Sequence, residues 1–141
     1  MCPPWVPFPS PVIYSDYTMI TPKRKLGDLG EKIALEYLKK NGYQILERNY
    51  QKKWGEIDII AQLKENIVFI EVKSKSKGMA IRPEQNVNFF KQKRLIKAAQ
   101  TYLLERKISP EKPWQIDVIA VELDFKNKKA NLRHLKNVIW A

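Results

Sequence analysis

The charged residues of GEIDIIAQLKENIVFIEVK, residues 55–73, stand at a spacing at which chemistry is possible. Glu56 and Asp58 are two apart in one apolar run, and Glu71 and Lys73 are two apart in the next. Side chains two apart on a strand share a face, so each run has an apolar face and a face that becomes charged toward one end. If the register sets Asp58 beside Glu71, the two carboxylates repel each other, and a divalent cation would remove that penalty. Oxygen ligands suit Mg²⁺ or Mn²⁺.

The same pattern also fits an ordinary solvent-facing hairpin. Glu-x-Lys is weak evidence by itself, because it recurs as Glu105-Arg106-Lys107 at the end of an expected helix. A slip of one residue in the register would also put Asp58 and Glu71 on opposite faces. The spacing therefore leaves both a metal site and a solvated face open.

The hairpin lies within a predicted α/β domain whose mixed sheet is flanked by helices. Apolar residues at helical spacing predict helices over residues 25–41, where Asn41-Gly42 is the stop signal, and 88–107. Runs rich in β-formers predict strands over residues 43–50, 55–61, 67–73, 114–123 and 130–140. Residues 74–86 are expected to be a loop. The resulting order is αβββαββ.

Charge is distributed unevenly along the chain. The 141 residues include 26 Lys and Arg against 15 Asp and Glu, a formal charge of +11. Residues 1–22 have no basic side chain and a single acid, Asp16, and they contain six of the nine prolines. We therefore expect residues 1–22 to be a disordered or loosely packed extension and residues 23–141 to be one basic domain. Such a charge favours a polyanionic partner, usually nucleic acid, over a merely solubilising surface.

Several protein classes are excluded by what the chain lacks. One cysteine, Cys2, and one histidine, His134, rule out an internal disulfide framework and a cysteine-rich zinc site. No apolar run approaches the roughly 18 residues that cross a membrane. The N-terminus has no basic region typical of a signal peptide, so we expect a cytoplasmic protein. Translation from Met19 instead of Met1 is an alternative that would remove most of the extension.

Several motifs in a fixed order resemble a known group of nucleases. An acid on one strand, followed about a dozen residues later by Glu-x-Lys on the next, resembles the PD-(D/E)xK nuclease superfamily with its restriction-endonuclease-like fold. More narrowly, the chain is similar to the YraN family of small predicted endonucleases, themselves similar to archaeal Holliday-junction resolvases. The segments that carry this likeness are GDLGEKIALEYL, RNYQKKWGEIDIIA, VFIEVK and KQKRLIKAAQTYL. The likeness extends over residues 23–140.

The resemblance implies a catalytic site and a cofactor. Asp58 and Glu71 would be metal ligands for Mg²⁺ or Mn²⁺, with the peptide oxygen of Val72 as an additional ligand. Lys73 would position the attacking water or stabilise the transition state. Glu31 matches an acid that resolvase-like enzymes add to the site, and its place at the edge of the apolar arc of the first helix permits an inward role.

Basic residues near these motifs are candidates for phosphate contacts. Lys91 falls inside the apolar sector of the second helix, where a lysine either extends back to solvent or serves a site. We favour the site, since the family helix has a lysine there. Arg94 flanks the same side, and Lys75 and Lys77 begin the expected loop. Arg48 is another candidate, with pairing to an acid across the sheet as its alternative.

These observations predict a Mg²⁺-dependent endonuclease acting on branched or structured DNA. The alternatives are a non-catalytic nucleic-acid-binding module with the same fold and a basic RNA- or ribosome-associated protein. Trp54, in an expected turn, either stacks on a splayed base or packs locally. His134 is expected at the surface. Cleavage of a junction would need two sites, which favours a homodimer.

Overall fold

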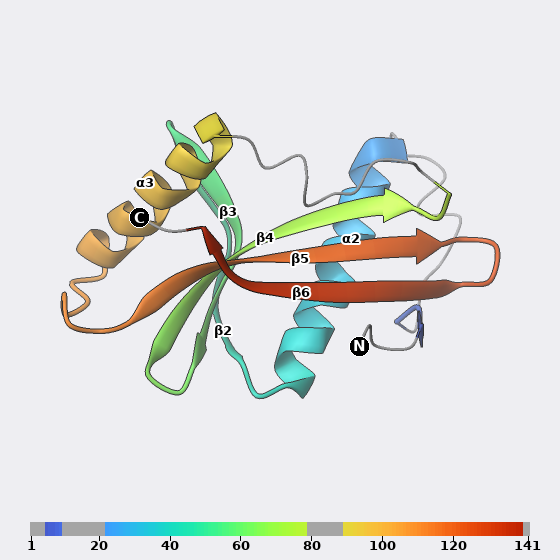
Figure 1. Cartoon of the computed structure of the whole chain (residues 1–141), viewed down its shortest axis with the longest axis horizontal. Coiled ribbons are helices and arrows are strands. Elements are labelled where there is room, and N and C mark those ends of the chain that lie inside the picture. Colours follow the sequence, from blue (N-terminus) through green and yellow to red (C-terminus); the bar gives the residue numbers. More distant parts are fainter. Residues whose placement is uncertain (1–4, 10–21, 79–88, 140–141) are drawn as a thin grey trace.

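The chain forms one mixed six-stranded sheet with two helices, seen in a computed structural model that describes residues 5–9, 22–78 and 89–139 (Figure 1). The sheet order is β1-β6-β5-β4-β3-β2, in which β4 and β5 are parallel and the other neighbours are antiparallel. The elements are β1 (Val6–Pro7), α2 (Pro22–Lys40), β2 (Gln44–Lys52), β3 (Gly55–Leu63), β4 (Asn66–Ser76), α3 (Phe89–Glu105), β5 (Trp114–Asp124) and β6 (Lys129–Ile139).

The α/β class, the mixed sheet and the order of the main elements are confirmed. The expected loop at residues 74–86 begins later than predicted, because β4 continues to Ser76 alongside β5. This parallel ladder extends as far as Leu123 opposite Ser76. Residues 79–88 of that expected loop lie outside the described residues.

Part of the proline-rich N-terminal segment is placed against the sheet. Val6 pairs with Ala130 and Pro7 with Lys129, which makes β1 an edge strand of two residues beside β6. Proline has no N–H to donate, so it is confined to such edges. Phe8 packs edge-to-face on Phe125 at a centroid distance of 5.7 Å. Composition did not predict this contact, and the rest of the segment, residues 1–4 and 10–21, lies outside the described residues.

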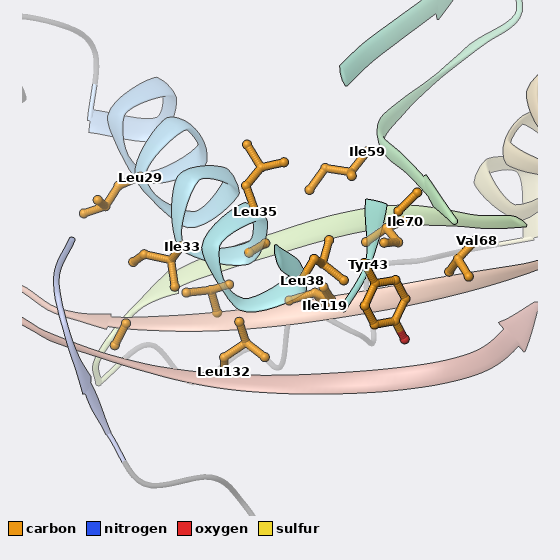
Figure 2. Packing of buried hydrophobic residues seen from close by; sticks show 14 of the residues in the cluster. Leu29, Ile33, Leu35, Leu38, Tyr43, Ile59, Val68, Ile70, Ile119 and Leu132 are labelled. Carbon is orange, nitrogen blue, oxygen red and sulfur yellow. The ribbon is translucent and has the colours of Figure 1, made fainter. Parts of the chain in front are cut away.

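One face of the sheet is covered by α2. Its apolar stripe packs on side chains that alternate along the central strands, as Figure 2 shows for Leu38, Ile59, Ile70 and Ile119. The helix ends at Lys40, and Gly42 follows in the turn, where its φ of +85° lets the Tyr43 N–H reach the carbonyl of Leu38 at 3.0 Å. This is the stop that the sequence predicted.

The opposite face of the sheet is covered by α3. On β4, Ile67 and Phe69 pack with α3, whereas Val68 and Ile70 pack with α2. Successive side chains of β4 thus enter opposite layers, as is typical of a strand that is buried on both faces. The sheet is therefore the middle layer of three, and a residue between its strands can be reached from α2 on one side and α3 on the other.

Helix α2 lies very close to β4 at Gly30. A Cβ built on Gly30 would be 1.8 Å from Oγ and 2.9 Å from Cβ of Ser74, so only glycine fits without movement. This contact fixes how closely the N-terminal half of α2 approaches the sheet. Over residues 5–9, 22–78 and 89–139, no helix is both long and apolar enough to cross a lipid bilayer.

Substitution of Gly30 tests this contact. We expect Gly30→Ala to lower the free energy of unfolding by about 1–3 kcal/mol, the usual range for overpacking, in urea or thermal denaturation. Gly27→Ala is the matched control, because a Cβ on this exposed glycine of the same helix meets nothing within 4 Å. It should leave stability unchanged or raise it by about 0.5–1 kcal/mol. Equal effects of the two substitutions would contradict the close contact.

Candidate functional site

The site lies where β3 and β4 separate. Their ladder runs from Leu63 opposite Asn66 to Ile59 opposite Ile70, and β4 then continues beside β5 alone. In Figure 1, β4 runs on toward the right while β3 turns away from it. The next residues in this register are Asp58 and Glu71, so the two predicted acids stand opposite each other where the ladder ends. The register that would have separated them is excluded.

At this fork the side chain of Asp58 takes the place of a backbone hydrogen-bond partner for β4. The N–H of Val72 donates a hydrogen bond of 2.8 Å to Oδ2 of Asp58. On β4, the odd-numbered residues point their backbone toward β5, as the bond from the Ile67 N–H to the carbonyl of Pro113 shows. The N–H and C=O of Val72 therefore both face the diverging β3. The Asp58 carboxylate therefore accepts a hydrogen bond from the Val72 N–H, which has no backbone partner on β3.

β3 changes the face it presents beside the fork. Its ladder with β2 keeps one register from Arg48 opposite Ile59 to Tyr50 opposite Ile57. Ile59 packs with α2, but Ile57, two residues away, packs with α3, so β3 changes face at Asp58. Its neighbour across the ladder, Asn49, has a φ of +50°, a left-handed conformation that asparagine tolerates.

Glu71 is held by two lysines. Oε1 of Glu71 lies 2.6 Å from Nζ of Lys91 and 3.2 Å from Nζ of Lys73. Glu71 is only 5% exposed. A buried carboxylate needs such partners, since removing a charge from water is costly. Lys73 comes from β4 itself, whereas Lys91 reaches in from α3, as its inward position on the helix predicted.

The charges of the site act strongly on one another. Burial, and after it the charge of Glu71, raise the pKa of Asp58 to about 8, although the Val72 N–H favours its charged form. Burial and the neighbouring ammonium of Lys91 lower the pKa of Lys73. Burial also acts to lower the pKa of Lys91, but the bond to Glu71 outweighs it and the pKa is raised. A strongly perturbed carboxyl such as Asp58, beside a second acid and two lysines, marks a candidate functional site.

Glu31 reaches toward the fork from α2. Its Oε1 is buried without a hydrogen-bond partner and lies 3.6 Å from Nη2 of Arg48. Burial raises the pKa of Glu31, and its charge contributes to the raised pKa of Asp58. Arg48 thus pairs with an acid from the neighbouring helix, close to the alternative considered for it. Both predicted residues lie near the site.

The possible metal donors at the fork are oxygens from two acids and one peptide group. Within the described ranges, no three Asp, Glu, His or Cys side chains come together as a metal-binding group. Asp58 and Glu71 provide two carboxylates, and Val72 turns its peptide oxygen to the same side. Mg²⁺ usually keeps several waters and binds proteins through one or two carboxylates, so this set suits it. The unpartnered oxygen of Glu31 is a further donor nearby.

A basic cleft adjoins the site. Its volume is about 620 Å³. It lies between the β2–β3 turn and the start of α3, and its lining residues are Gln51, Lys52, Lys53, Trp54, Gly55, Glu56, Lys91, Arg94 and Leu95. Trp54 is 37% exposed, and Nζ of Lys97 sits 5.0 Å from the centre of its ring. Lys91 thus lines the cleft and also contacts Glu71.

Gly55 lets α3 reach this position. A Cβ on Gly55 would lie 2.9 Å from the backbone oxygen of Arg94, so a larger residue would push the helix away. Helix α3 packs against β3 just where Lys91 and Arg94 must face the cleft. Gly55 thus sets the distance between α3 and the fork, although in the sequence it stood out only as part of a motif.

Two other predicted phosphate contacts are engaged elsewhere. Nζ of Lys75 lies 3.0 Å from Oε2 of Glu122, and Nζ of Lys77 lies 3.5 Å from Oδ2 of Asp124. Lys77 also sits over the ring of Trp5 at 5.4 Å. Because β4 extends to Ser76, Lys75 belongs to a strand and not to a loop. The structure does not bring these two lysines into the cleft.

The surface position expected for His134 is wrong. Its side chain is 5% exposed, its Nδ1 forms a hydrogen bond of 2.8 Å with the Tyr37 hydroxyl, and its Nε2 contacts Oδ2 of Asp117 at 2.6 Å. Asp117 is fully buried and also accepts from Gln115 and from the Asn137 N–H. This network joins α2, β5 and β6. The alternation of Ala130, Leu132 and His134 on β6 was the available signal.

The pKa of Asp58 leads to a stability prediction. Because the folded protein holds this proton more tightly than the unfolded chain, whose ordinary value is 3.8, stability decreases as pH rises from about 4 to about 8. Asp58→Asn keeps an acceptor for Val72 but does not ionise. We expect it to raise the free energy of unfolding by roughly 1–3 kcal/mol at pH 8 and by little at pH 4. Urea denaturation between pH 4 and pH 8 measures this difference. Parallel curves of unfolding free energy against pH for the two proteins would contradict the raised pKa of Asp58.

Comparison with known proteins gives the chain its family. Residues 30–121 match the model described as Uncharacterised protein family UPF0102. A UPF0102 protein of Alkaliphilus oremlandii is 41% identical over 114 residues, which are 81% of this chain and 97% of that protein. One of Caldanaerobacter subterraneus is 43% identical over 119 residues, 84% of this chain and 95% of that protein. The matched region contains Glu31, the β3–β4 fork and the start of α3, and the chain belongs to the uncharacterised protein family UPF0102.

Proposed function

We propose that the chain is a metal-dependent endonuclease that hydrolyses phosphodiester bonds in branched or structured DNA. The observation that carries the proposal is the pairing of Asp58 and Glu71 at the end of the β3–β4 ladder, with Lys73 and Lys91 on one oxygen of Glu71. The likeness to YraN nucleases and to the restriction-endonuclease-like fold, seen in the motifs, adds to it. Acids, lysines and a basic cleft are the parts that phosphodiester cleavage requires.

Each side chain has a role that follows from its position. Asp58 and Glu71, with the peptide oxygen of Val72, would hold Mg²⁺ or Mn²⁺. Such an ion supplies a Lewis acid that stabilises charge on the phosphate and lowers the pKa of a bound water. Lys73, whose pKa is lowered, would orient the attacking water or accept its proton. Glu31 adds a carboxylate that can hold water by hydrogen bonds.

The cleft supports nucleic acid as the substrate. Lys53 and Arg94 line it on either side, and Lys91 stands between it and Glu71. Backbone contacts of this kind fix position without reading sequence, so we propose recognition by charge and DNA shape. Trp54 lines the cleft, whereas Lys97, which covers its ring, is not among the lining residues. Because Trp54 is 37% exposed and lines the cleft, its ring would be available to stack on an unpaired base.

A non-catalytic nucleic-acid-binding module remains the second candidate. One observation favours it: Glu71 already has two ammonium partners, so its charge is compensated without a cation. Against it stands the raised pKa of Asp58, because a module that only binds phosphate gains nothing from a second buried acid at that place.

Cleavage assays distinguish the two. We expect the purified protein to cut flap or four-way-junction DNA with Mg²⁺ or Mn²⁺ and to lose all activity in EDTA. Asp58→Asn, Glu71→Gln and Lys73→Met should each lower the rate about 100-fold or more, as removal of one electrostatic group does in other enzymes. Lys39→Ala, an exposed position on α2, is the control. Binding without cleavage on every substrate and metal would favour the module.

Salt-dependent binding tests the cleft. Lys53→Ala and Arg94→Ala should each weaken DNA binding uniformly across sequences and reduce the slope of log affinity against log salt by about one, since each removes a phosphate contact. Fluorescence anisotropy at several salt concentrations gives both quantities. Lys39→Ala changes the net charge equally but lies on the other helix. If it matched the cleft variants, binding would depend on total charge and not on the cleft.

A further inference from the structure

Lys91 occupies a place that a metal ion would need. Its Nζ is 2.6 Å from Oε1 of Glu71, and Lys73 contacts the same oxygen at 3.2 Å. A divalent cation bound between Asp58 and Glu71 would therefore stand against two ammonium groups. Like charges at such distances repel strongly in a buried site. A cation that binds through Oε1 of Glu71 has to displace at least one of these lysines.

The structure indicates which lysine moves. Lys73 lies two residues from Glu71 on the same strand, and its side chain is 19% exposed. The Lys91 side chain is 31% exposed, belongs to α3, and lines the cleft that opens away from the fork. Lysine carries its charge on a long flexible stem. Lys91 can therefore swing from Glu71 into the cleft without any change in the sheet.

The cleft offers Lys91 a second anionic partner when DNA is present. Lys53 and Arg94 line the same cleft, so a phosphate drawn there would lie within reach of the Lys91 head group. Glu71 competes for Lys91 when the cleft holds no phosphate. A DNA phosphate would bind Lys91 and a cation would bind Glu71, so each of them would break the Lys91–Glu71 ion pair.

We propose that Lys91 is an internal counter-ion that closes Glu71 until DNA enters the cleft, so that cation and DNA binding favour each other. This proposal rests on the proposed function. The coupling is reciprocal: DNA raises the affinity for the cation by the same factor as the cation raises the affinity for DNA. Its consequence is that the free protein binds the cation weakly and assembles its site on the substrate.

Titration with Mn²⁺ alone is the first test. Lys91→Met removes the ammonium but keeps the length of the side chain, and it should bind Mn²⁺ about tenfold more tightly than the wild type in the absence of DNA. Electron paramagnetic resonance of free Mn²⁺ or calorimetry reports this affinity without any turnover. Lys93→Met, an exposed lysine two residues away, is matched in charge and should leave the affinity unchanged. Lys91→Gln and thermal denaturation exclude a folding defect.

The second test measures the coupling. Fluorescence anisotropy of a flap oligonucleotide duplex, with Ca²⁺ or with EDTA, should show that Ca²⁺ strengthens DNA binding more in the wild type than in Lys91→Met. Unchanged or weaker Mn²⁺ binding by Lys91→Met would overturn this inference, while cleavage by the wild type would leave the proposed function standing. If neither protein bound Mn²⁺ without DNA, this inference would be overturned, and the proposed function would be decided separately by the cleavage assay.

Discussion

The hydrogen bond from the Val72 N–H to Asp58 marks the constraint on which the site depends. A strand that loses its neighbour leaves buried backbone groups without partners, and such groups are costly. Here the end of the β3–β4 ladder exposes Val72, and a carboxylate serves it at 2.8 Å. The same divergence leaves a gap between the strands that α2 reaches with Glu31 and α3 reaches with Lys91. The arrangement of these side chains thus follows from the end of the β3–β4 ladder at Ile59 and Ile70.

Much of this could be predicted, because it depends on local patterns. Helical spacing located α2 and α3, and alternation located the long strands, since burial imposes those periods. Period-two spacing singled out Glu56, Asp58, Glu71 and Lys73 but left a solvated face open, and the family likeness selected the last three as site residues. Helical spacing gave the inward position of Lys91.

The remainder depends on packing between distant segments. No local sequence pattern predicts that Asn49 adopts a φ of +50°, or that Gly55 lies close to the backbone of Arg94. Lys75 and Lys77 looked like free loop lysines because their partners, Glu122 and Asp124, lie on a strand far along the chain. His134 was misjudged for the same reason, since its partners come from α2 and β5.

A crystal structure with Mn²⁺ located by anomalous scattering would test whether the fork binds a metal ion. We expect one strong peak between the carboxylates of Asp58 and Glu71, with the peptide oxygen of Val72 at about 2.2 Å, a typical distance for an oxygen ligand of such an ion. Nζ of Lys91 should then have moved away from Glu71. A structure at high Mn²⁺ concentration with no peak at the fork, and with Lys91 still on Glu71, would contradict this expectation.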